Sequence, residues 1–432
     1  MQKTRLKEIQ VSWDGQALAV CGKEDAAHCK SITRAARRLK GLPVFHVSTT
    51  AYGGGVAEML HSQIGFERAA GLQSRWFLFQ APGAFFKVTK KIHNLLQGKP
   101  GMLTAPEREY YLEVNHGAEA SFRRMLGRTK NGLLVIHDPQ PLPLVNFVPD
   151  GVASILRIHV DLSTPHAGTV EFLRPLIEKY RAVVVSHDDY LRELPWLSKT
   201  KSRIIYPAID PAAPKNVPMA EATAQSVLEK LGIHPGRPMA VQVSRFDPWK
   251  DPLGVIKAYY LAKNAIPDLE LVLAGLRFAA DDPEAVEVFE EVTRHAKGSP
   301  ADIHLFENPG QLGDISNDTF VSALYTAARV VVQKSLREGF GLTMTEAMWK
   351  GKPVVAGLTA GARVQITNGK NGILVASPEA AARAIVRLIR DPKLAARLGK
   401  AAHASVKRRF LLPRLVLDHM KLYSSLMKPS QR

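Results

Sequence analysis

Cysteine is nearly absent from this chain of 432 residues, which contains only Cys21 and Cys29. Two cysteines are too few for a disulfide framework, and their spacing does not supply a four-ligand metal site. We therefore expect both to be free thiols. The chain also lacks a run of about 18 apolar residues, so no membrane span is predicted. Its charged start, MQKTRLKE, does not resemble a secretory signal, and the cytoplasm is the expected compartment.

Acidic residues are outnumbered, with 40 Asp and Glu against 58 Lys and Arg, which gives a formal charge of +18. Such a charge suits a nucleic-acid surface, an anionic membrane surface or an enzyme of phosphorylated substrates. The densest basic stretches, residues 34–40, 87–91 and 383–409, interleave cations with apolar residues at helical spacing. No Gly-aromatic nucleic-acid motif accompanies them. We interpret them as solvated helix faces and expect neither a nucleic-acid nor a membrane partner.

The chain is longer than one hydrophobic core usually supports, so two domains of roughly 200 residues are expected. Short β-rich runs alternate with amphipathic stretches, which is typical of parallel α/β sheets. The expected strands are residues 42–47, 74–79, 133–136, 155–160, 182–185, 203–205, 240–243, 269–273, 303–306, 330–332, 353–356 and 373–375. Three prolines between residues 207 and 214 interrupt the pattern and indicate a boundary. We predict two doubly wound, Rossmann-like domains at 1–206 and 207–408, with helices at 378–409 and 413–427.

The first chemical motif, STTAYGGGVAEML at residues 48–60, directly follows an expected strand. Three consecutive glycines let the backbone approach a ligand closely, and the next helix offers free N–H groups to an anion. The motif is neither Gly-x-Gly-x-x-Gly nor a P-loop. A tight turn alone would need only one glycine. We therefore predict a phosphate or sugar cradle that includes Gly54 and Gly55.

The second motif is VSRFDPWK at residues 243–250, after the first expected strand of the second domain. Arg245 and Lys250 lie five residues apart in a loop that a proline and a tryptophan would stiffen. A guanidinium fork and a point charge at this spacing suit a diphosphate. A pair of solvated surface cations is the alternative.

The third motif is SLREGFGLTMTEA at residues 335–347. It places Glu338 at the rim of a crevice and Glu346 in the early turns of a helix. The amino end of that helix can take a phosphate on backbone N–H groups, while Glu346 accepts hydrogen bonds from hydroxyl groups. An acidic first helical turn would explain Glu346 but not the Gly-Phe-Gly loop.

The fourth motif pairs HDPQP at residues 137–141 with RIHVD at residues 157–161. Ligands of open α/β sheets bind outside the carboxyl ends of the strands, so both segments are candidates for an acceptor site. Either histidine could equally be structural. The candidate residues are His137, Asp138, Gln140, His159 and Asp161.

Together these motifs resemble the retaining GT-B glycosyltransferases of group 1, and among them the trehalose glycosyltransferring synthases. The general features are the glycine loop, the Arg245 and Lys250 pair, and the Glu338-x7-Glu346 pair. The more specific segments are GGGVAE at 53–58, RWF at 75–77, FFKVTK at 85–90, HNLLQG at 93–98, HDPQP at 137–141, SRFDPWK at 244–250 and residues 337–353. The resemblance extends from about residue 44 to about residue 420. Fungal-type trehalose phosphorylases share several of these motifs but are longer chains.

The resemblance implies a GT-B fold, with two Rossmann-like domains facing across a deep cleft and a C-terminal helix, 409–432, returning to the N-terminal domain. It implies a cytoplasmic hexosyltransferase that makes trehalose from a nucleoside-diphosphate-glucose, UDP- or ADP-glucose, and glucose, with retention of configuration. Arg245, Lys250 and Glu338 would be the catalytic residues. The other implied donor-binding residues are Gly54, Gly55, Asn308 in the base-binding loop, Gly339, Phe340, Gly341, Leu342 and Glu346, which would bind the ribose. The five acceptor candidates would line the glucose side.

Two segments depart from the family pattern. Residues 357–365 are less glycine-rich than expected, and residues 306–319 diverge around the base site, which leaves the donor base open. Three alternatives remain: a trehalose phosphorylase, a GT-B glycosyltransferase with another acceptor, and a basic RNA- or membrane-binding protein with a degenerate GT-B fold. The expected partners are small molecules, namely nucleotide-glucose, glucose and trehalose. No catalytic metal and no tightly bound cofactor are expected, while stimulation by Mg²⁺ and a homodimer are left open.

Overall fold

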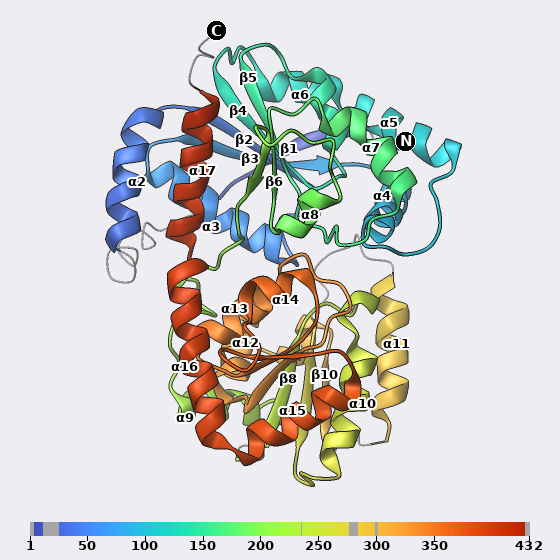
Figure 1. The fold of residues 1–432 in the computed structure, drawn as a ribbon, viewed down its shortest axis with the longest axis vertical. Coiled ribbons are helices and arrows are strands. Elements are labelled where there is room, and N and C mark those ends of the chain that lie inside the picture. The colour runs from blue at the N-terminus through green and yellow to red at the C-terminus, as the bar shows by residue number, and fades with distance from the viewer. Residues whose placement is uncertain (1–3, 12–25, 235, 276–283, 299–300, 428–432) are drawn as a thin grey trace. The chain divides into compact units, whose positions relative to one another are not determined.

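A computed structural model of the protein describes residues 4–11, 26–234, 236–275, 284–298 and 301–427. The chain forms two compact units, one of Met1–Pro207 with Leu412–Arg432 and one of Ala208–Leu411 (Figure 1). Each unit contains a mainly parallel sheet with helical connections, so the predicted class, two doubly wound α/β domains, is confirmed. Among the described residues, none of the helices combines the length and the apolar character that a bilayer crossing requires.

In its described part, the first unit has a seven-stranded sheet in the order β1-β3-β2-β4-β5-β6-β7. Its strands are β1 (Arg5–Ile9), β2 (Pro43–Ser48), β3 (Gln73–Gln80), β4 (Gly132–His137), β5 (Val152–Arg157), β6 (Ala182–Val185) and β7 (Ser202–Ile204). Strands β4 and β5 are buried at every residue, as their continuous apolar runs require of the middle of a parallel sheet. The predicted strands therefore include the centre of the core.

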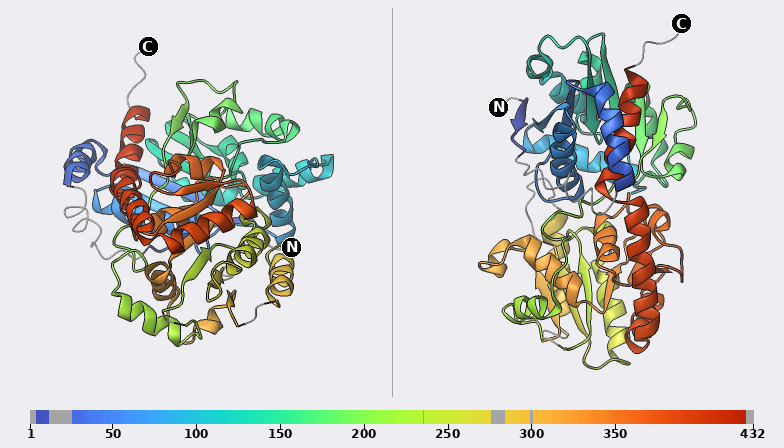
Figure 2. Two further views of the ribbon diagram at one scale, coloured as in Figure 1. Left: turned by 60° about the horizontal axis from the view of Figure 1, so that its bottom comes forward. Right: turned by 90° about the vertical axis from the view of Figure 1, so that its left-hand side faces the viewer.

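The helices of the first unit connect these strands, and the last of them comes from the far end of the sequence. They are α2 (Ala26–Leu39), α3 (Gly55–Ala69), α4 (Gly83–Leu96), α5 (Ala105–His116), α6 (Glu119–Leu126), η1 (Leu142–Phe147), α7 (Ala167–Ile177), α8 (Asp188–Arg192) and α17 (Leu412–Leu426). Helix α17 packs against α2 and α3, and Figure 2 shows it in red beside the blue α2. The hydroxyl of Tyr423 in α17 donates to Oε1 of Glu67 in α3 at 3.1 Å. The expected return of the C-terminal helix to the N-terminal domain is confirmed.

The described part of the second unit has a six-stranded, wholly parallel sheet in the order β10-β9-β8-β11-β12-β13. Its strands are β8 (Met239–Val243), β9 (Glu270–Ala274), β10 (Ile303–Phe306), β11 (Val330–Gln333), β12 (Val354–Gly357) and β13 (Ile373–Val375). Its helices are α9 (Glu221–Glu229), η2 (Pro248–Lys250), α10 (Pro252–Lys263), α11 (Glu284–Ala296), η3 (Pro309–Leu312), α12 (Asn317–Ala327), α13 (Leu342–Trp349), α14 (Ala360–Gln365), α15 (Pro378–Arg390) and α16 (Pro392–Arg409). Apolar side chains of α10, α15 and the central strands form one continuous core.

Two elements differ from the sequence-based expectation. The segment expected as one helix from residue 378 to 409 is divided after Arg390, because Pro392 has no N–H to continue the helix. The side chain of Asp391 instead caps α16 by accepting from the N–H of Leu394 at 2.9 Å. The strand expected at 155–160 ends at Arg157. The N–H of Ile158 still donates to the carbonyl of Val184, whereas those of His159 and Val160 donate to the side chain of Asp138.

The expectation of a free thiol is wrong for Cys29, which is disulfide-bonded. A count of two cysteines excludes a disulfide framework but not a single bridge. Cys21 lies outside the described residues.

Candidate active site

The glycine loop of the first unit connects β2 to α3. Gly53 has φ +81°, a conformation that side chains rarely adopt, whereas Gly54 is extended with φ −173° and forms the N-cap of α3. A Cβ atom added to Gly54 would meet nothing within 4 Å. Only Gly53 therefore needs to be glycine for the turn, and the space beside Gly54 is open.

Three histidines and a glutamate form a hydrogen-bonded chain in the first unit. Oε2 of Glu67 in α3 lies 3.1 Å from Nε2 of His46 in β2. Nδ1 of His46 lies 3.1 Å from Nε2 of His137, the last residue of β4. Nδ1 of His137 lies 3.0 Å from Nε2 of His159, which follows β5. The chain thus runs from the interior to a loop at the carboxyl ends of the strands.

The surroundings of this hydrogen-bonded series shift the pKa values of Glu67, His137 and His159. Burial would raise the pKa of Glu67, but His46 and hydrogen bonds from Gln63 and Ser74 outweigh it and lower the pKa to about 2. Burial, together with neighbouring cationic groups, lowers the pKa of His137 and His159 well below 6.5. If every ring carries one proton and donates toward ionised Glu67, Nδ1 of His159 is left as a hydrogen-bond acceptor.

Asp138 uses one carboxylate oxygen to bind backbone groups of the neighbouring loop. Its Oδ1 accepts from the backbone N–H groups of His159 at 2.7 Å and Val160 at 3.3 Å. Its backbone is left-handed, with φ +65°. Burial raises the pKa of Asp138 to about 6, against the opposing effect of these hydrogen bonds and of Arg157. Oδ1 of Asp138 therefore stabilises the loop that carries His159.

Arg157 ends β5 close to this loop and is fully buried. Within the described residues its three guanidinium nitrogens have no hydrogen-bond partner. Burial and the charge of Arg414 lower the pKa of Arg157 to about 9. An unsatisfied guanidinium beside candidate ligand-binding residues is a costly arrangement, which indicates that this region is adapted to a polar ligand.

The remaining acceptor candidates lie in the same two loops. Asp161 is buried, and its Oδ1 accepts from the N–H of Ser163 at 2.7 Å. The backbone carbonyl of Gln140 accepts from Nδ2 of Asn115 at 3.1 Å, whereas its side-chain Oε1 has no partner among the described residues. The structure thus brings the five candidates into one neighbourhood and leaves the side chain of Gln140 available.

In the second unit, the loops after β8 and β11 meet. The ammonium group of Lys250 contacts Oε2 of Glu338, and both side chains are largely buried. The backbone N–H of Leu336 donates to the carbonyl of Trp249 at 2.8 Å, which joins the two loops directly. The structure therefore pairs two of the three predicted catalytic residues.

The Glu338 loop has φ +83° at Gly341, which forms the N-cap of α13. Gln365 in α14 is buried and donates from Nε2 to the carbonyl of Phe340 at 2.6 Å. The N–H of Gly361 donates to the carbonyl of Glu338 at 3.1 Å. The segment 357–365, noted above only as a departure from the family pattern, thus supports this loop, and the sequence analysis missed Gln365.

The other predicted donor residues have separate partners. Nη2 of Arg245 lies 3.6 Å from Oδ2 of Asp247, and nearly half of the arginine side chain is exposed. Glu346 in α13 is buried and pairs at 2.7 Å with Lys215, a residue that the sequence analysis did not identify. Oδ1 of Asn308 caps η3 by accepting from the N–H of Gly310 at 2.8 Å.

The predicted donor-binding residues are divided between the two units. Gly339 and Leu342 flank Phe340 and Gly341 at the start of α13, whereas Gly54 and Gly55 belong to the first unit. Glu67 and His46 were not predicted, although a polar residue inside the apolar run PVFHVS was a visible signal for His46. Neither lies in a loop, where functional residues were sought.

Comparison with known proteins identifies both units. Residues 46–192 match the family described as "Trehalose synthase, N-terminal domain", and residues 225–405 match "Glycosyl transferases group 1". The chain is 39% identical to a trehalose synthase of Rubrobacter xylanophilus over 91% of this chain and 92% of that protein. It is 37% identical to a trehalose synthase of Pyrococcus horikoshii, over 94% and 95%.

More distant proteins share part of this likeness. A trehalose phosphorylase of Pleurotus pulmonarius is 27% identical over 78% of this chain, which spans only half of that protein. A trehalose-phosphate synthase structure from Burkholderia xenovorans has a TM-score of 0.71 at 10% identity, covering 89% of this chain and 100% of that one. A sucrose-phosphate synthase structure from Thermosynechococcus elongatus has a TM-score of 0.68 at 20% identity, covering 89% and 99%. With this GT-B architecture and the two near-full-length relatives, the chain belongs to the trehalose synthase family of group 1 glycosyltransferases.

Proposed function

We propose that the protein makes trehalose by transferring glucose from a nucleoside-diphosphate-glucose to free glucose, with release of the nucleoside diphosphate. The observation that carries the proposal is the meeting of Lys250, Glu338 and the amino end of α13 where the loops after β8 and β11 join. The two trehalose synthases that match the chain over nearly its whole length support trehalose as the product.

The donor is proposed to bind to the second unit, where cations can meet the charge of a leaving diphosphate. Lys250, Arg245 and the first N–H groups of α13 would supply this stabilisation in place of a metal ion. In the free protein, Lys250 contacts Glu338. An incoming diphosphate would take over the ammonium group, and the Glu338 carboxylate could then accept hydrogen bonds from the transferred glucose.

The stereochemistry of the product limits the mechanism. Both anomeric carbons of trehalose are α, so transfer from an α-linked donor must retain configuration. Retention requires either front-face attack through an oxocarbenium-like state or a covalent intermediate. We propose front-face attack, in which Glu338 binds hydroxyl groups of the transferred glucose and does not attack its anomeric carbon.

The acceptor glucose is proposed to bind to the loops after β4 and β5 of the first unit. There, Gln140 has an unpartnered side-chain oxygen among the described residues, and we propose the tautomer of His159 whose Nδ1 is an acceptor. Both atoms can accept hydrogen bonds from sugar hydroxyls. Asp138 would hold His159 in place through the backbone rather than contact the sugar.

The proposal is tested with purified protein, glucose and each of UDP-, ADP- and GDP-glucose in separate reactions. Trehalose and the matching nucleoside diphosphate should accumulate together with at least one donor. A parallel reaction with trehalose and inorganic phosphate tests the phosphorylase alternative. Formation of glucose phosphate there, with no product from any nucleotide-glucose, would exclude the proposed reaction. Product formed only with a different acceptor would exclude glucose as the second substrate.

A further inference from the structure

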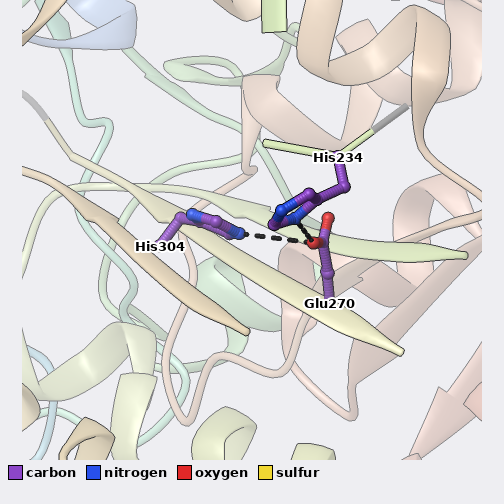
Figure 3. Close-up of side chains that lie close together, drawn as sticks. All are labelled: His234, Glu270 and His304. Atoms are coloured by element: carbon purple, nitrogen blue, oxygen red, sulfur yellow. Dashed lines mark hydrogen bonds and ion pairs between the residues drawn. The ribbon is translucent and has the colours of Figure 1, made fainter. Parts of the chain in front are cut away.

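Two histidines and a buried glutamate converge in the second unit (Figure 3). His234 lies in the loop between α9 and β8, Glu270 is the first residue of β9, and His304 is the second residue of β10. These positions are at the amino ends of the strands. Lys250 and Glu338 follow the carboxyl ends, so the cluster is not part of the proposed donor site.

The ligand atoms of the three side chains are spaced nearly as they would be around a bound metal ion. Their candidate ligand atoms all lie within 4.8 Å of one another. Oε1 of Glu270 is 2.5 Å from Nδ1 of His234 and 3.7 Å from Nε2 of His304. Tetrahedral zinc with bonds of roughly 2.0–2.2 Å separates its ligand atoms by about 3.4 Å. A shift of about 1 Å in His234 and less in His304 would bring both nitrogens to this separation from Oε1.

The existing contacts leave two of the cluster's atoms unsatisfied. Glu270 is fully buried, and among the described residues its Oε2 has no hydrogen-bond partner. The same holds for Nε2 of His304. Buried polar atoms without partners cost free energy, and a cation that binds Nε2 of His304 and both carboxylate oxygens would satisfy them. His234 is more than half exposed and can move without disturbing the core.

Arg237 also contacts Glu270, and its positive charge would lie close to a metal ion bound there. Its Nη1 lies 3.0 Å from Oε1 of Glu270. The guanidinium is held independently, because Nη2 donates to Asp302 at 2.6 Å and Nε donates to the carbonyl of Asp268 at 2.9 Å. A metal bound at Oε1 would replace the Nη1 contact, while the guanidinium keeps its hydrogen bonds to Asp302 and Asp268.

We propose that His234, Glu270 and His304 bind a divalent metal ion of the zinc class, with a fourth position open to water. Two imidazoles and one carboxylate are a common zinc ligand set, and imidazole favours transition metals over Mg²⁺ and Ca²⁺. The bound ion would join the loop before β8 to β9 and β10. Because the ligands come together only in the folded chain, binding would stabilise the second unit.

The test uses full-length protein freed of metal by a chelator and then dialysed. Titration with Co²⁺ should give the visible absorption of a tetrahedral site at one equivalent, and Zn²⁺ should abolish that absorption. Zn²⁺ should also raise the unfolding temperature, whereas Mg²⁺ should not. His234→Ala, His304→Ala and Glu270→Gln should each weaken Zn²⁺ binding about tenfold or more.

His295→Ala is the matched control, since His295 is an exposed histidine of the same unit whose Nδ1 bonds to the carbonyl of Glu291. It should bind metal as the wild type does. His234→Ala removes an exposed side chain, so loss of folding cannot explain its effect. Equal Zn²⁺ affinity of the wild type and His234→Ala, or no metal binding by the wild type, would overturn the proposal and leave a purely hydrogen-bonded cluster.

Discussion

The ammonium group of Lys250 contacts the carboxylate of Glu338. We propose that it binds the diphosphate of the donor instead when the donor is present. Lys250→Ala should lower kcat by about 10²–10³, because the charge of the leaving group would no longer be met. Steady-state kinetics with the preferred nucleotide-glucose would measure the loss. Lys257→Ala is the control, since Lys257 is an exposed lysine of the same unit that pairs with Glu379. A Lys250→Ala enzyme with unchanged kcat would refute the assignment.

Asp138 offers a second test, on the acceptor side. Asp138→Ala should raise KM for glucose far more than KM for the donor, because His159 would lose its backbone support. Each unpaired N–H costs about 1–3 kcal/mol, and alanine also tolerates the left-handed backbone poorly. Asp138→Asn retains an acceptor oxygen and suits that backbone, so it should behave nearly as the wild type. A donor KM that rises while the glucose KM stays unchanged would reverse our placement of the two sugars.

Glu67 should make the stability of the protein depend on pH. Its pKa is about 2 in the folded protein and 4.5 ordinarily, so its stabilisation is present above pH 4.5 and is lost as the pH falls toward 2. Its full value is about 3 kcal/mol. Glu67→Gln should therefore unfold more easily than the wild type at pH 7, and the difference should shrink below pH 4.5. Urea unfolding at several pH values measures this, and a constant difference would contradict the assignment.

At the scale of elements, α14 presses closely on the loop that carries Glu338. A Cβ atom on Gly361 would lie 2.6 Å from Cα and O of Phe340 and 2.8 Å from the carbonyl oxygen of Glu338. Gly361→Ala should therefore displace the loop, destabilise the fold by about 1–3 kcal/mol and lower activity. Thermal unfolding and kinetics would show both effects.

Gly83→Ala is the control for that substitution. Gly83 is the first residue of α4, and an added Cβ would meet nothing within 4 Å. Alanine there should be neutral or stabilise by about 0.4–1 kcal/mol through the unfolded chain. Equal effects of the two substitutions would show that the contact between α14 and the loop is unimportant.

The strands that could be predicted from sequence are those buried on both faces. In β4 and β11 the apolar run coincides with the strand, because water is excluded from both sides. Strand β1 was missed, since RLKEI is partly exposed and pairs antiparallel to β3 at the edge of the sheet. The end of β5 was misplaced because Ile158 and Val160 are apolar, whereas the ladder stops where Asp138 takes the backbone N–H groups.

At the scale of the whole molecule, the two-unit division and the family could be read from motifs spread along the chain. The motif residues were found because loops at the carboxyl ends of parallel strands carry ligand sites. The residues that support them were not, because Glu67, Lys215 and Gln365 act through contacts distant in sequence. No spacing rule connects Lys215 to Glu346 across 130 intervening positions; only the folded second unit does.

The central claim is that one glucose of the product comes from the nucleotide and the other from free glucose. It is tested by incubating the protein with ¹³C-labelled nucleotide-glucose and unlabelled glucose, and following the reaction by NMR. We predict α,α-trehalose labelled in one ring only, formed in equal amount with the nucleoside diphosphate. Unlabelled trehalose, label recovered only as free glucose, or a product with a β anomeric carbon would contradict the account.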